Sequence, residues 1–397
     1  MPVRDKQAEK KAWLGWLALF LVTAAIIMAG SSRSVVPAYR TAALSWFAGQ
    51  GLYDGAGVGG FVYLPQAAIL FAPFAMIPQT MGEVLWRLVN IGVFALGLLG
   101  FARLGQERSG KSFFPLMTLV AIPLAWDCAR NGQATLMMAG FMLLAVADMT
   151  RCRWWRAVLW LSLSVAMKPL AIVLVLLVMA IDRPMTWRLL VGMAAVALSP
   201  FLAQSPAYVL QQYTAFLHNS TTAAHVGVVV QGWTSPFSAL RLMGVELTEQ
   251  VQMAIRLVAA FGTLALCFLV RRRYDANRSA IYVYSLAALY LILFSPRTEN
   301  NTYAMLGPSI AVFLSLTFLT EKRFGQGIFL ACLTVVLLGS RPIGNALAPH
   351  TIISWVPPLM ATCFAAYLFF RLYTEPAKGA DKQTIAGPTA ASETTGI

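Results

Sequence analysis

Long apolar stretches recur along the whole chain and are separated by short polar segments. A run of about 20 apolar residues is the length that an α-helix needs to cross the hydrocarbon core of a bilayer. We therefore predict an all-α polytopic membrane protein with about twelve transmembrane helices. The predicted spans are 13–30, 83–101, 112–126, 132–149, 157–167, 170–181, 186–203, 250–270, 279–295, 302–319, 327–340 and 351–371.

Some segments depart from this simple pattern. The spans 157–167 and 170–181 are too short to cross a core of about 30 Å, so a re-entrant or broken pair is predicted around Lys168-Pro169. The apolar segment 61–78 is interrupted by three prolines and is expected to form a short interfacial or re-entrant helix on the outer side. The segment Val35–Ala48 mixes polar with apolar residues, which indicates a helix lying along the outer surface.

The C-terminal tail Glu375–Ile397 is rich in Ala, Thr, Gly and Lys and has almost no large apolar residues. Such a composition cannot bury enough apolar surface to fold, so we expect a disordered cytoplasmic tail. Residues 1–374 then form a single transmembrane domain.

Composition agrees with a membrane protein. Of the 397 residues, 58% are hydrophobic and 12% are charged, and the mean hydropathy is +0.68. A soluble domain carries about 25% charged residues. These values exclude a soluble globular protein, a disordered chain and a disulfide-rich scaffold. The five cysteines show no spacing typical of disulfides or metal ligands.

The net charge of +14 would indicate a nucleic-acid partner in a soluble protein, but here it first indicates orientation. Twenty-one of the 30 Lys and Arg lie in the N-terminus, the tail and five short basic loops. Placing these segments inside puts both termini in the cytoplasm. The other nine cations then face outward with six carboxylates, so the outer side is only weakly positive, and no nucleic acid is expected.

Polar side chains gather at turns on the predicted outer side. Asp127–Gln133 and Ser295–Asn301 are tight polar turns between apolar runs, and Lys168 stands alone in apolar sequence. Each has a plain structural interpretation, namely a solvated hairpin, a local Arg297–Glu299 pair and a snorkelling lysine. Together, three cations at turns on one side favour an anionic ligand, such as a phosphate held beside amide side chains.

Motifs of ATP-driven or metal-driven chemistry are absent from the sequence. It contains no Walker loop, no HExxH, no GxSxG and no Cys/His spacing typical of a metal site. We therefore expect neither a metal nor a cofactor.

Six short motifs occur in an order that carries a family resemblance. They are Tyr63-Leu-Pro65, AILFAPFAMIP, IPLAWDCARNGQATLMMAGFMLLA, LSVAMKPLAIVLVLL, GWTSPFSALRL and FSPRTENNTYAMLGP. In this order the chain resembles the integral-membrane GT-C glycosyltransferases over most of residues 10–320. It is most similar to glycosyltransferase family 87, the polyprenol-phosphate-mannose-dependent mannosyltransferases.

The resemblance implies a GT-C-like bundle in a bacterial inner (plasma) membrane. It implies transfer of a hexose, mannose in the family, from a polyprenyl-phosphate donor to a lipid or glycan acceptor on the extracytoplasmic face. The expected partners are that donor, the acceptor and membrane lipids, and we expect a monomer. The family's NGQ-type turn matches residues 131–133, and its Lys-Pro turn matches Lys168-Pro169. The residues expected to bind the donor or its phosphate are Arg40, Tyr63, Arg130, Asn131, Gln133, Lys168, Arg297 and Glu299.

One departure from the family concerns the catalytic base. Members carry an acidic residue just after the first span and shortly before a Tyr, whereas Ser31–Tyr39 contains no acid. Three explanations are open. Asp54 or Asp127 has taken the role of general base, or the acceptor needs no such base, or the protein is not an active transferase of this type. The first explanation is preferred, so Asp54 and Asp127 are the predicted catalytic residues.

Two other functional classes stay open from the sequence. Broken helices and charged residues near membrane depth also suit a lipid-linked-sugar flippase or a secondary transporter. A non-catalytic relative that retains the transferase fold is the other alternative, because the fold alone does not determine the function.

Overall fold

The computed structural model of the chain describes residues 6–30, 33–53, 60–106, 110–226, 234–295, 298–347 and 351–375. These residues form helices and no β-strand. The α-helices are α1 (Lys6–Met28), α2 (Val36–Phe47), α3 (Pro65–Ala75), α4 (Gln79–Gln106), α5 (Phe114–Asn131), α6 (Thr135–Met149), α7 (Trp154–Met167), α8 (Ile172–Ile181), α9 (Arg183–Leu198), α10 (Pro206–Val226), α11 (Pro236–Leu242), α12 (Glu249–Arg273), α13 (Ala276–Phe294), α14 (Leu306–Ser315), α15 (Phe324–Leu347) and α16 (Thr351–Thr374). The short elements are the 3-10 helices η1 (Pro169–Ala171), η2 (Ser199–Leu202) and η3 (Asn300–Met305) and the π-helix η4 (Leu316–Glu321).

Eight helical segments within the described ranges are long and apolar enough to cross a membrane. They are Lys6–Met28, Gln79–Gln106, Arg183–Leu202, Glu249–Arg273, Ala276–Phe294, Asn300–Glu321, Phe324–Leu347 and Ile352–Thr374. The prediction of an all-α polytopic membrane protein is therefore confirmed.

The sequence predicts twelve spans, and the difference of four lies in α5 to α8. These helices have 18, 15, 14 and 10 residues. α6 is buried along almost its whole length between α4 and α7. A helix surrounded by protein need not reach both membrane surfaces, because neighbouring helices satisfy the groups at its ends.

The chain breaks at the predicted Lys-Pro position. α7 ends at Met167, Lys168 is extended with φ −152° and ψ 115°, and Pro169 begins η1. A residue before proline is disfavoured in the α region, and proline has no N–H for a helical hydrogen bond. The local sequence therefore stops α7 and offsets α8 from it.

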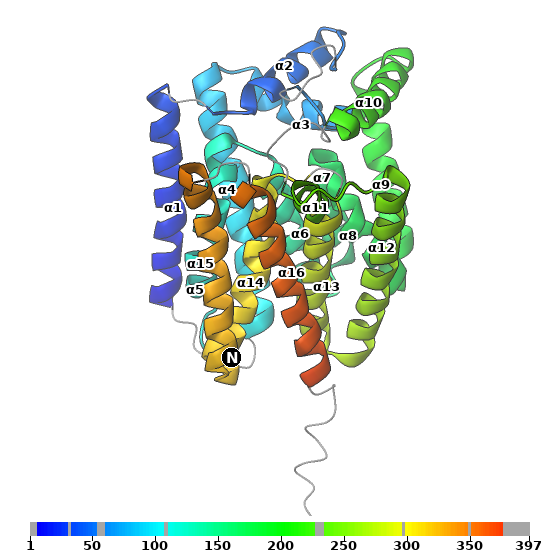
Figure 1. Cartoon of the computed structure of the whole chain (residues 1–397). Coiled ribbons are helices and arrows are strands. Elements are labelled where there is room, and N and C mark those ends of the chain that lie inside the picture. Colours follow the sequence, from blue (N-terminus) through cyan, green and yellow to red (C-terminus); the bar gives the residue numbers. More distant parts are fainter. Residues whose placement is uncertain are drawn as a thin grey trace, which may run out of the picture.

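Figure 1 shows α2, α3 and α10 at the end of the bundle opposite to the N-terminus. α2 and α3 have 12 and 11 residues, too few to span, as predicted for the segments 35–48 and 61–78. The rings of Tyr39, Phe71 and Trp86 contact one another at centroid distances of 4.9 to 5.9 Å. These aromatic contacts hold α2 and α3 against the adjacent end of α4.

α4 and α6 cross at two glycines near the centre of the bundle. A Cβ at Gly97 would lie 2.5 Å from the carbonyl oxygen of Gly140, and a Cβ at Gly140 would lie 2.7 Å from the backbone of Val93. Small residues at such a crossing let the backbones touch, which maximises van der Waals contact in a lipid environment. This crossing fixes α6, whose first residue follows the polar turn described below.

We call the end of the bundle that carries the N-terminus and the basic loops the basic end (Figure 1). A buried ionic cluster closes this end. Arg371 is fully buried, and its Nη2 donates to Glu321 Oε1 at 2.7 Å. Arg278 also pairs with Glu321, at 2.9 Å, and both arginines contact Glu375. Glu375, the first residue of the predicted tail, therefore belongs to the folded part, and residues 376–397 lie outside the described residues.

Candidate functional site

The turn after α5 is held by hydrogen bonds to four consecutive carbonyl groups. The carbonyls at the C-terminal end of a helix have no partner within the helix. Arg87 Nη2 donates to Arg130 O (3.0 Å), and the N–H of Val35 donates to Asn131 O (3.0 Å). Next along the turn, Trp86 Nε1 donates to Gly132 O (2.7 Å), and Asn90 Nδ2 donates to Gln133 O (2.9 Å). α4 and the start of α2 therefore define the path of the backbone through residues 130–133.

Gly132 is required in this turn for two reasons. Its φ of +68° lies in the left-handed region that ends many helices and favours glycine. A Cβ at this position would also lie 2.5 Å from Val36 Cγ2 and 3.1 Å from Arg87 Cζ. The turn therefore packs directly against α2 and α4.

Arg87 is the centre of the support under this turn. It is only 1% exposed, and Nη1 pairs with Glu83 Oε2 at 3.2 Å. Its Nη2 also donates to Ser34 Oγ at 3.1 Å, and the Ser34 hydroxyl donates to Glu83 Oε2 at 2.9 Å. The sequence prediction did not single out Arg87, although a Glu and an Arg four residues apart on one helix is a signal for such a pair.

Gln133 and Glu299 meet across the bundle. Gln133 Nε2 donates to Glu299 Oε2 at 3.2 Å, and the Gln133 residue is 8% exposed. Glu299 directly precedes η3, and its N–H donates to Thr302 Oγ1 at 3.3 Å. The Sγ–H of Cys128, on α5, donates to Asn301 O at 2.9 Å and joins the same two parts of the chain. Two polar turns that are 166 residues apart thus form one site.

Lys168 reaches the start of α6. Its Nζ donates to Thr135 Oγ1 at 2.9 Å, two residues after Gln133 in the sequence. The ammonium group carries three N–H donors, so two remain for other acceptors once Thr135 has taken one. Among the described residues, no carboxylate forms an ion pair with it.

Two tyrosines cover the same turn from the α2 and α3 side. The hydroxyl groups of Tyr39 and Tyr63 share a hydrogen bond of 3.1 Å, and the N–H of Ala134 donates to Tyr39 Oη at 3.4 Å. Burial raises the pKa of Tyr39 well above its ordinary value, and Tyr63 and the carboxylate of Glu299 raise it further. Tyr39 is thus a neutral hydrogen-bonding group. We call the following residues the central polar cluster: Tyr39, Tyr63, Gln133, Thr135, Lys168 and Glu299.

Other predicted site residues lie beside this cluster. Asp127 forms an ion pair with Arg341 of α15, in which both side chains are partly exposed. Arg130 and Asn131 belong to the turn through their carbonyl groups, and the Arg130 Nε has no hydrogen-bond partner within the described ranges. Asp54 and Arg297 lie outside the described residues.

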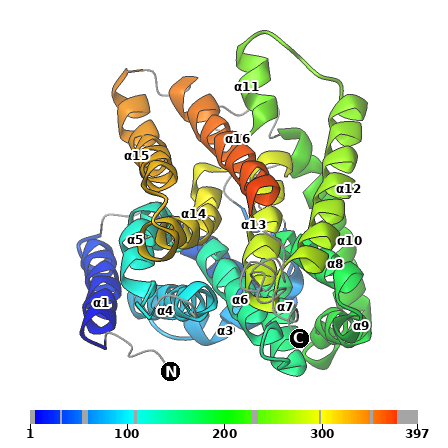
Figure 2. The ribbon, with the colours of Figure 1, turned by 90° about the horizontal axis from the view of Figure 1, so that it is seen from below.

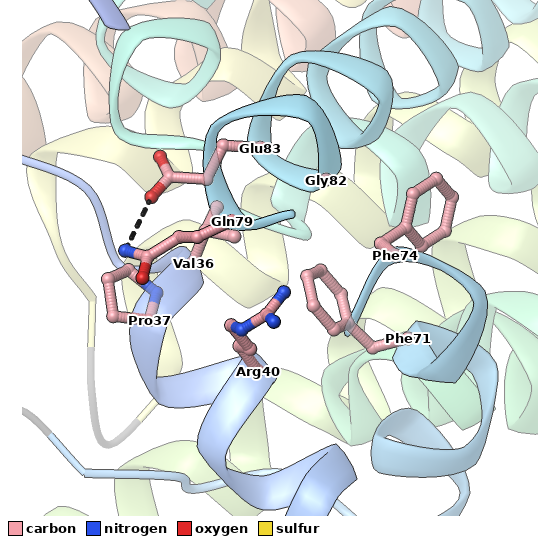
Figure 3. Close-up of a pocket in the computed structure, with 8 residues that line it drawn as sticks. All are labelled: Val36, Pro37, Arg40, Phe71, Phe74, Gln79, Gly82 and Glu83. Carbon is pink, nitrogen blue, oxygen red and sulfur yellow. Dashed lines mark hydrogen bonds between the residues drawn. The ribbon is translucent and has the colours of Figure 1, made fainter. Parts of the chain in front are cut away.

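Arg40 lies away from the cluster. Its Nη1 donates to the carbonyl oxygen of Ile77 at 2.7 Å. Figure 3 shows Arg40 in a recess between α2, α3 and α4, with a hydrogen bond between Gln79 and Glu83 on the far wall. The residues that line this recess are Val36, Pro37, Arg40, Phe71, Phe74, Gln79, Gly82 and Glu83.

The cluster offers one ammonium group, one carboxylate, an amide and hydroxyl groups from separate parts of the chain. Within the ranges that the structure describes, no three His, Cys, Asp or Glu side chains are grouped as a metal site would require. This set of groups can bind a phosphate through Lys168 and orient hydroxyl groups of a polar substrate.

The model of glycosyltransferase family 87 matches residues 61–296 of the chain. The matched stretch covers more than half of the sequence and contains Tyr63, the turn 130–133 and Lys168, and it ends three residues before Glu299. No curated protein matches the chain.

Proposed function

Because the chain belongs to glycosyltransferase family 87 and is a membrane glycosyltransferase, we propose that it uses a polyprenyl-phosphate-linked hexose as its donor. The sugar, mannose by the family likeness, passes to a lipid or glycan acceptor on the extracytoplasmic face. The observation that carries this proposal is that Lys168 bonds to Thr135, two residues after the Gln133 that bonds to Glu299. A cation and a carboxylate within one polar cluster suit a reaction that releases a phosphate and deprotonates a hydroxyl.

Lys168 binds the donor phosphate in this proposal. Thr135 holds its Nζ at 2.9 Å and leaves two N–H donors for phosphate oxygens. As the glycosidic bond breaks, negative charge grows on the leaving polyprenyl phosphate, and a preorganised ammonium group stabilises that charge. Arg130, whose Nε has no partner among the described residues, is the second cation for this phosphate.

A carboxylate takes the proton from the acceptor hydroxyl. Asp54 is the proposed base, because it is the carboxylate in the first predicted outer loop, near the position where family members carry an acid. Glu299 is the carboxylate already within the cluster. Asp127 is the weaker candidate, since an ion pair with Arg341 occupies its carboxylate.

The direct test is transfer by the purified full-length protein in lipid vesicles. Polyprenyl-phosphate hexoses are supplied with a panel of lipid and glycan acceptors, and released polyprenyl phosphate is measured together with glycosylated product. Product formation with a polyprenyl-phosphate donor and not with a nucleotide-sugar donor is expected. Transfer from the nucleotide sugar alone would overturn the proposed donor class.

Three amide variants then identify the base. Asp54→Asn should abolish transfer and keep donor binding, because an amide cannot accept the acceptor proton. Glu299→Gln should keep part of the activity if Glu299 only orients Gln133. Asp127→Asn should retain transfer. Normal turnover by Asp54→Asn would remove this residue from the mechanism, and loss of transfer in Glu299→Gln alone would assign the base to Glu299.

The orientation follows from the distribution of charge. We propose a bacterial inner membrane, with the basic end of the bundle and both termini in the cytoplasm. The central polar cluster is then on the periplasmic or exterior side, where α2, α3 and α10 lie.

A further inference from the structure

The ends of α7 and α9 at the basic end of the bundle carry two exposed tryptophans. Trp155 and Trp187 are 54% and 51% exposed. Their rings contact edge to face across the two helices, with centroids 5.4 Å apart. Tryptophans of membrane proteins concentrate at the level of the lipid headgroups, where the ring is in apolar and the N–H in polar surroundings. The pair therefore marks the level at which headgroups meet α7 and α9, which Figure 2 shows at the edge of the bundle.

Arg188 is positioned over both tryptophan rings. Its Cζ lies 4.5 Å from the centroid of Trp187 and 5.9 Å from that of Trp155. One guanidinium nitrogen donates to the carbonyl oxygen of Pro184, and Nε has no partner among the described residues. Cation–π contact orients the guanidinium and leaves its positive charge in place. Arg188 thus presents a fixed cation at the level of the headgroups.

Carboxylates near this surface are already paired. Asp148 is shared by Arg153 and Arg156, at 3.8 and 3.2 Å. Asp182 is buried and pairs with Arg271 at 3.4 Å. Further exposed cations at this end of α7 and α9 are Arg151 and Arg183. The surface around Arg188 therefore has an excess of positive charge that carboxylates of the described residues do not neutralise.

An apolar surface continues from the tryptophans toward the middle of the bundle. Leu159 on α7 and Leu190 and Val191 on α9 are 51%, 57% and 49% exposed. α7 and α9 are in direct contact here, because a Cβ at Gly192 would lie 2.6 Å from Ser162 Oγ. A cation at the headgroup level followed by an apolar strip matches the layout of a phospholipid, with its phosphate outside and its acyl chains inside.

We propose that Arg188, Trp155 and Trp187 form a binding site for an anionic phospholipid of the leaflet at the basic end. The guanidinium of Arg188 binds the phosphate with paired N–H groups, as arginine does more effectively than lysine. The tryptophans pack against the glycerol backbone and the first carbons of the acyl chains. Basic pockets between helices at the cytoplasmic side of a membrane bind anionic lipid headgroups. This site lies at the end of the bundle opposite to the central polar cluster, so it is independent of the donor proposed above.

The test is native mass spectrometry of the detergent-solubilised full-length protein with added phosphatidylglycerol or phosphatidylcholine. Wild type should bind phosphatidylglycerol in preference. Arg188→Gln should weaken that binding about fivefold, the effect of one basic residue at an anionic surface. Arg188→Lys, which keeps the charge but loses the planar fork, should lie between the two.

Arg272→Gln is the matched control, because Arg272 is exposed at the same end of the bundle and contacts no tryptophan among the described residues. It should leave phosphatidylglycerol binding unchanged. An equal loss in Arg272→Gln would show that only general surface charge attracts the lipid and would overturn the proposal. Equal binding of both lipids by wild type would overturn it as well. Should Arg188→Gln fail to fold, Trp187→Leu with Arg188 intact must lower phosphatidylglycerol binding for the proposal to stand.

Discussion

Replacing Gly132 by alanine tests whether the turn after α5 positions the transferase site. The substitution adds one methyl group at a position with φ +68°, where that group would lie 2.5 Å from Val36 Cγ2 and 3.1 Å from Arg87 Cζ. A non-glycine residue in the left-handed region costs about 1–2 kcal/mol. Extra volume in a packed site costs a further 1–3 kcal/mol or so. The free energy of unfolding should therefore fall by about 2–5 kcal/mol.

The control separates these two contributions. Gly49 has the same φ of +68°, and a Cβ there would meet no atom within 4 Å. Gly49→Ala should therefore lose only about 1–2 kcal/mol from backbone strain. The larger loss in Gly132→Ala measures the contact of the turn with α2 and α4.

Both variants are compared by unfolding in mixed SDS micelles and by the rate of sugar transfer. In Gly132→Ala the added methyl group displaces the backbone that carries Gln133, and a shift of about 1 Å lowers the rate roughly 10²-fold. Gly49→Ala should transfer sugar at the wild-type rate. The reasoning is refuted if the two variants lose the same stability and keep the same activity, since the turn would then tolerate a side chain.

Three other predictions concern Lys168, Arg87 and the orientation of the chain in the membrane. Lys168→Ala should lower the transfer rate about 10²- to 10³-fold. Lys10 is exposed at the basic end, so Lys10→Ala should transfer sugar at the wild-type rate. Equal rates of the two variants in the transfer assay would contradict a phosphate-binding role for Lys168. Arg87→Met should reduce the free energy of unfolding by about 3–5 kcal/mol, because Glu83 stays buried without its counter-charge; a loss below about 1 kcal/mol in SDS unfolding would refute this. Cys152 is exposed in the basic loop between α6 and α7. In a variant whose other cysteines are replaced, Cys152 should react with an impermeant maleimide in inside-out vesicles only. Reaction in right-side-out vesicles would reverse the proposed orientation.

The local part of the fold was predictable because it depends on short-range patterns. Apolar runs of sufficient length predict the eight long spans, and proline after Lys168 predicts the break between α7 and α8. Twelve spans were predicted, and the four that are not among these eight helices are α5 to α8. Run length alone also does not show that protein surrounds a helix, as it surrounds α6 between α4 and α7.

The candidate site was only partly predictable. Gln133, Lys168 and Glu299 were expected from polar turns between spans and from the family resemblance. In the structure Gln133 bonds to Glu299, and Lys168 bonds to Thr135, two residues after Gln133. The support from Trp86 and Asn90 was missed, because an indole and an amide inside a span resemble ordinary packing residues. The partner of Asp127 was missed too, since Arg341 lies 214 residues further along the chain.

By itself, the sequence determined a helical membrane protein of glycosyltransferase family 87 with polar turns at the ends of its spans. Hydrophobic periodicity, proline positions and charge distribution are properties of neighbouring residues, so they can be read without a fold. Only the tertiary structure decided which turns meet, which carbonyl groups Arg87, Trp86 and Asn90 hold, and that Asp127 is paired with Arg341. Those outcomes depend on how α2, α4, α6 and α15 pack in three dimensions, and residues far apart in sequence approach one another only through that packing.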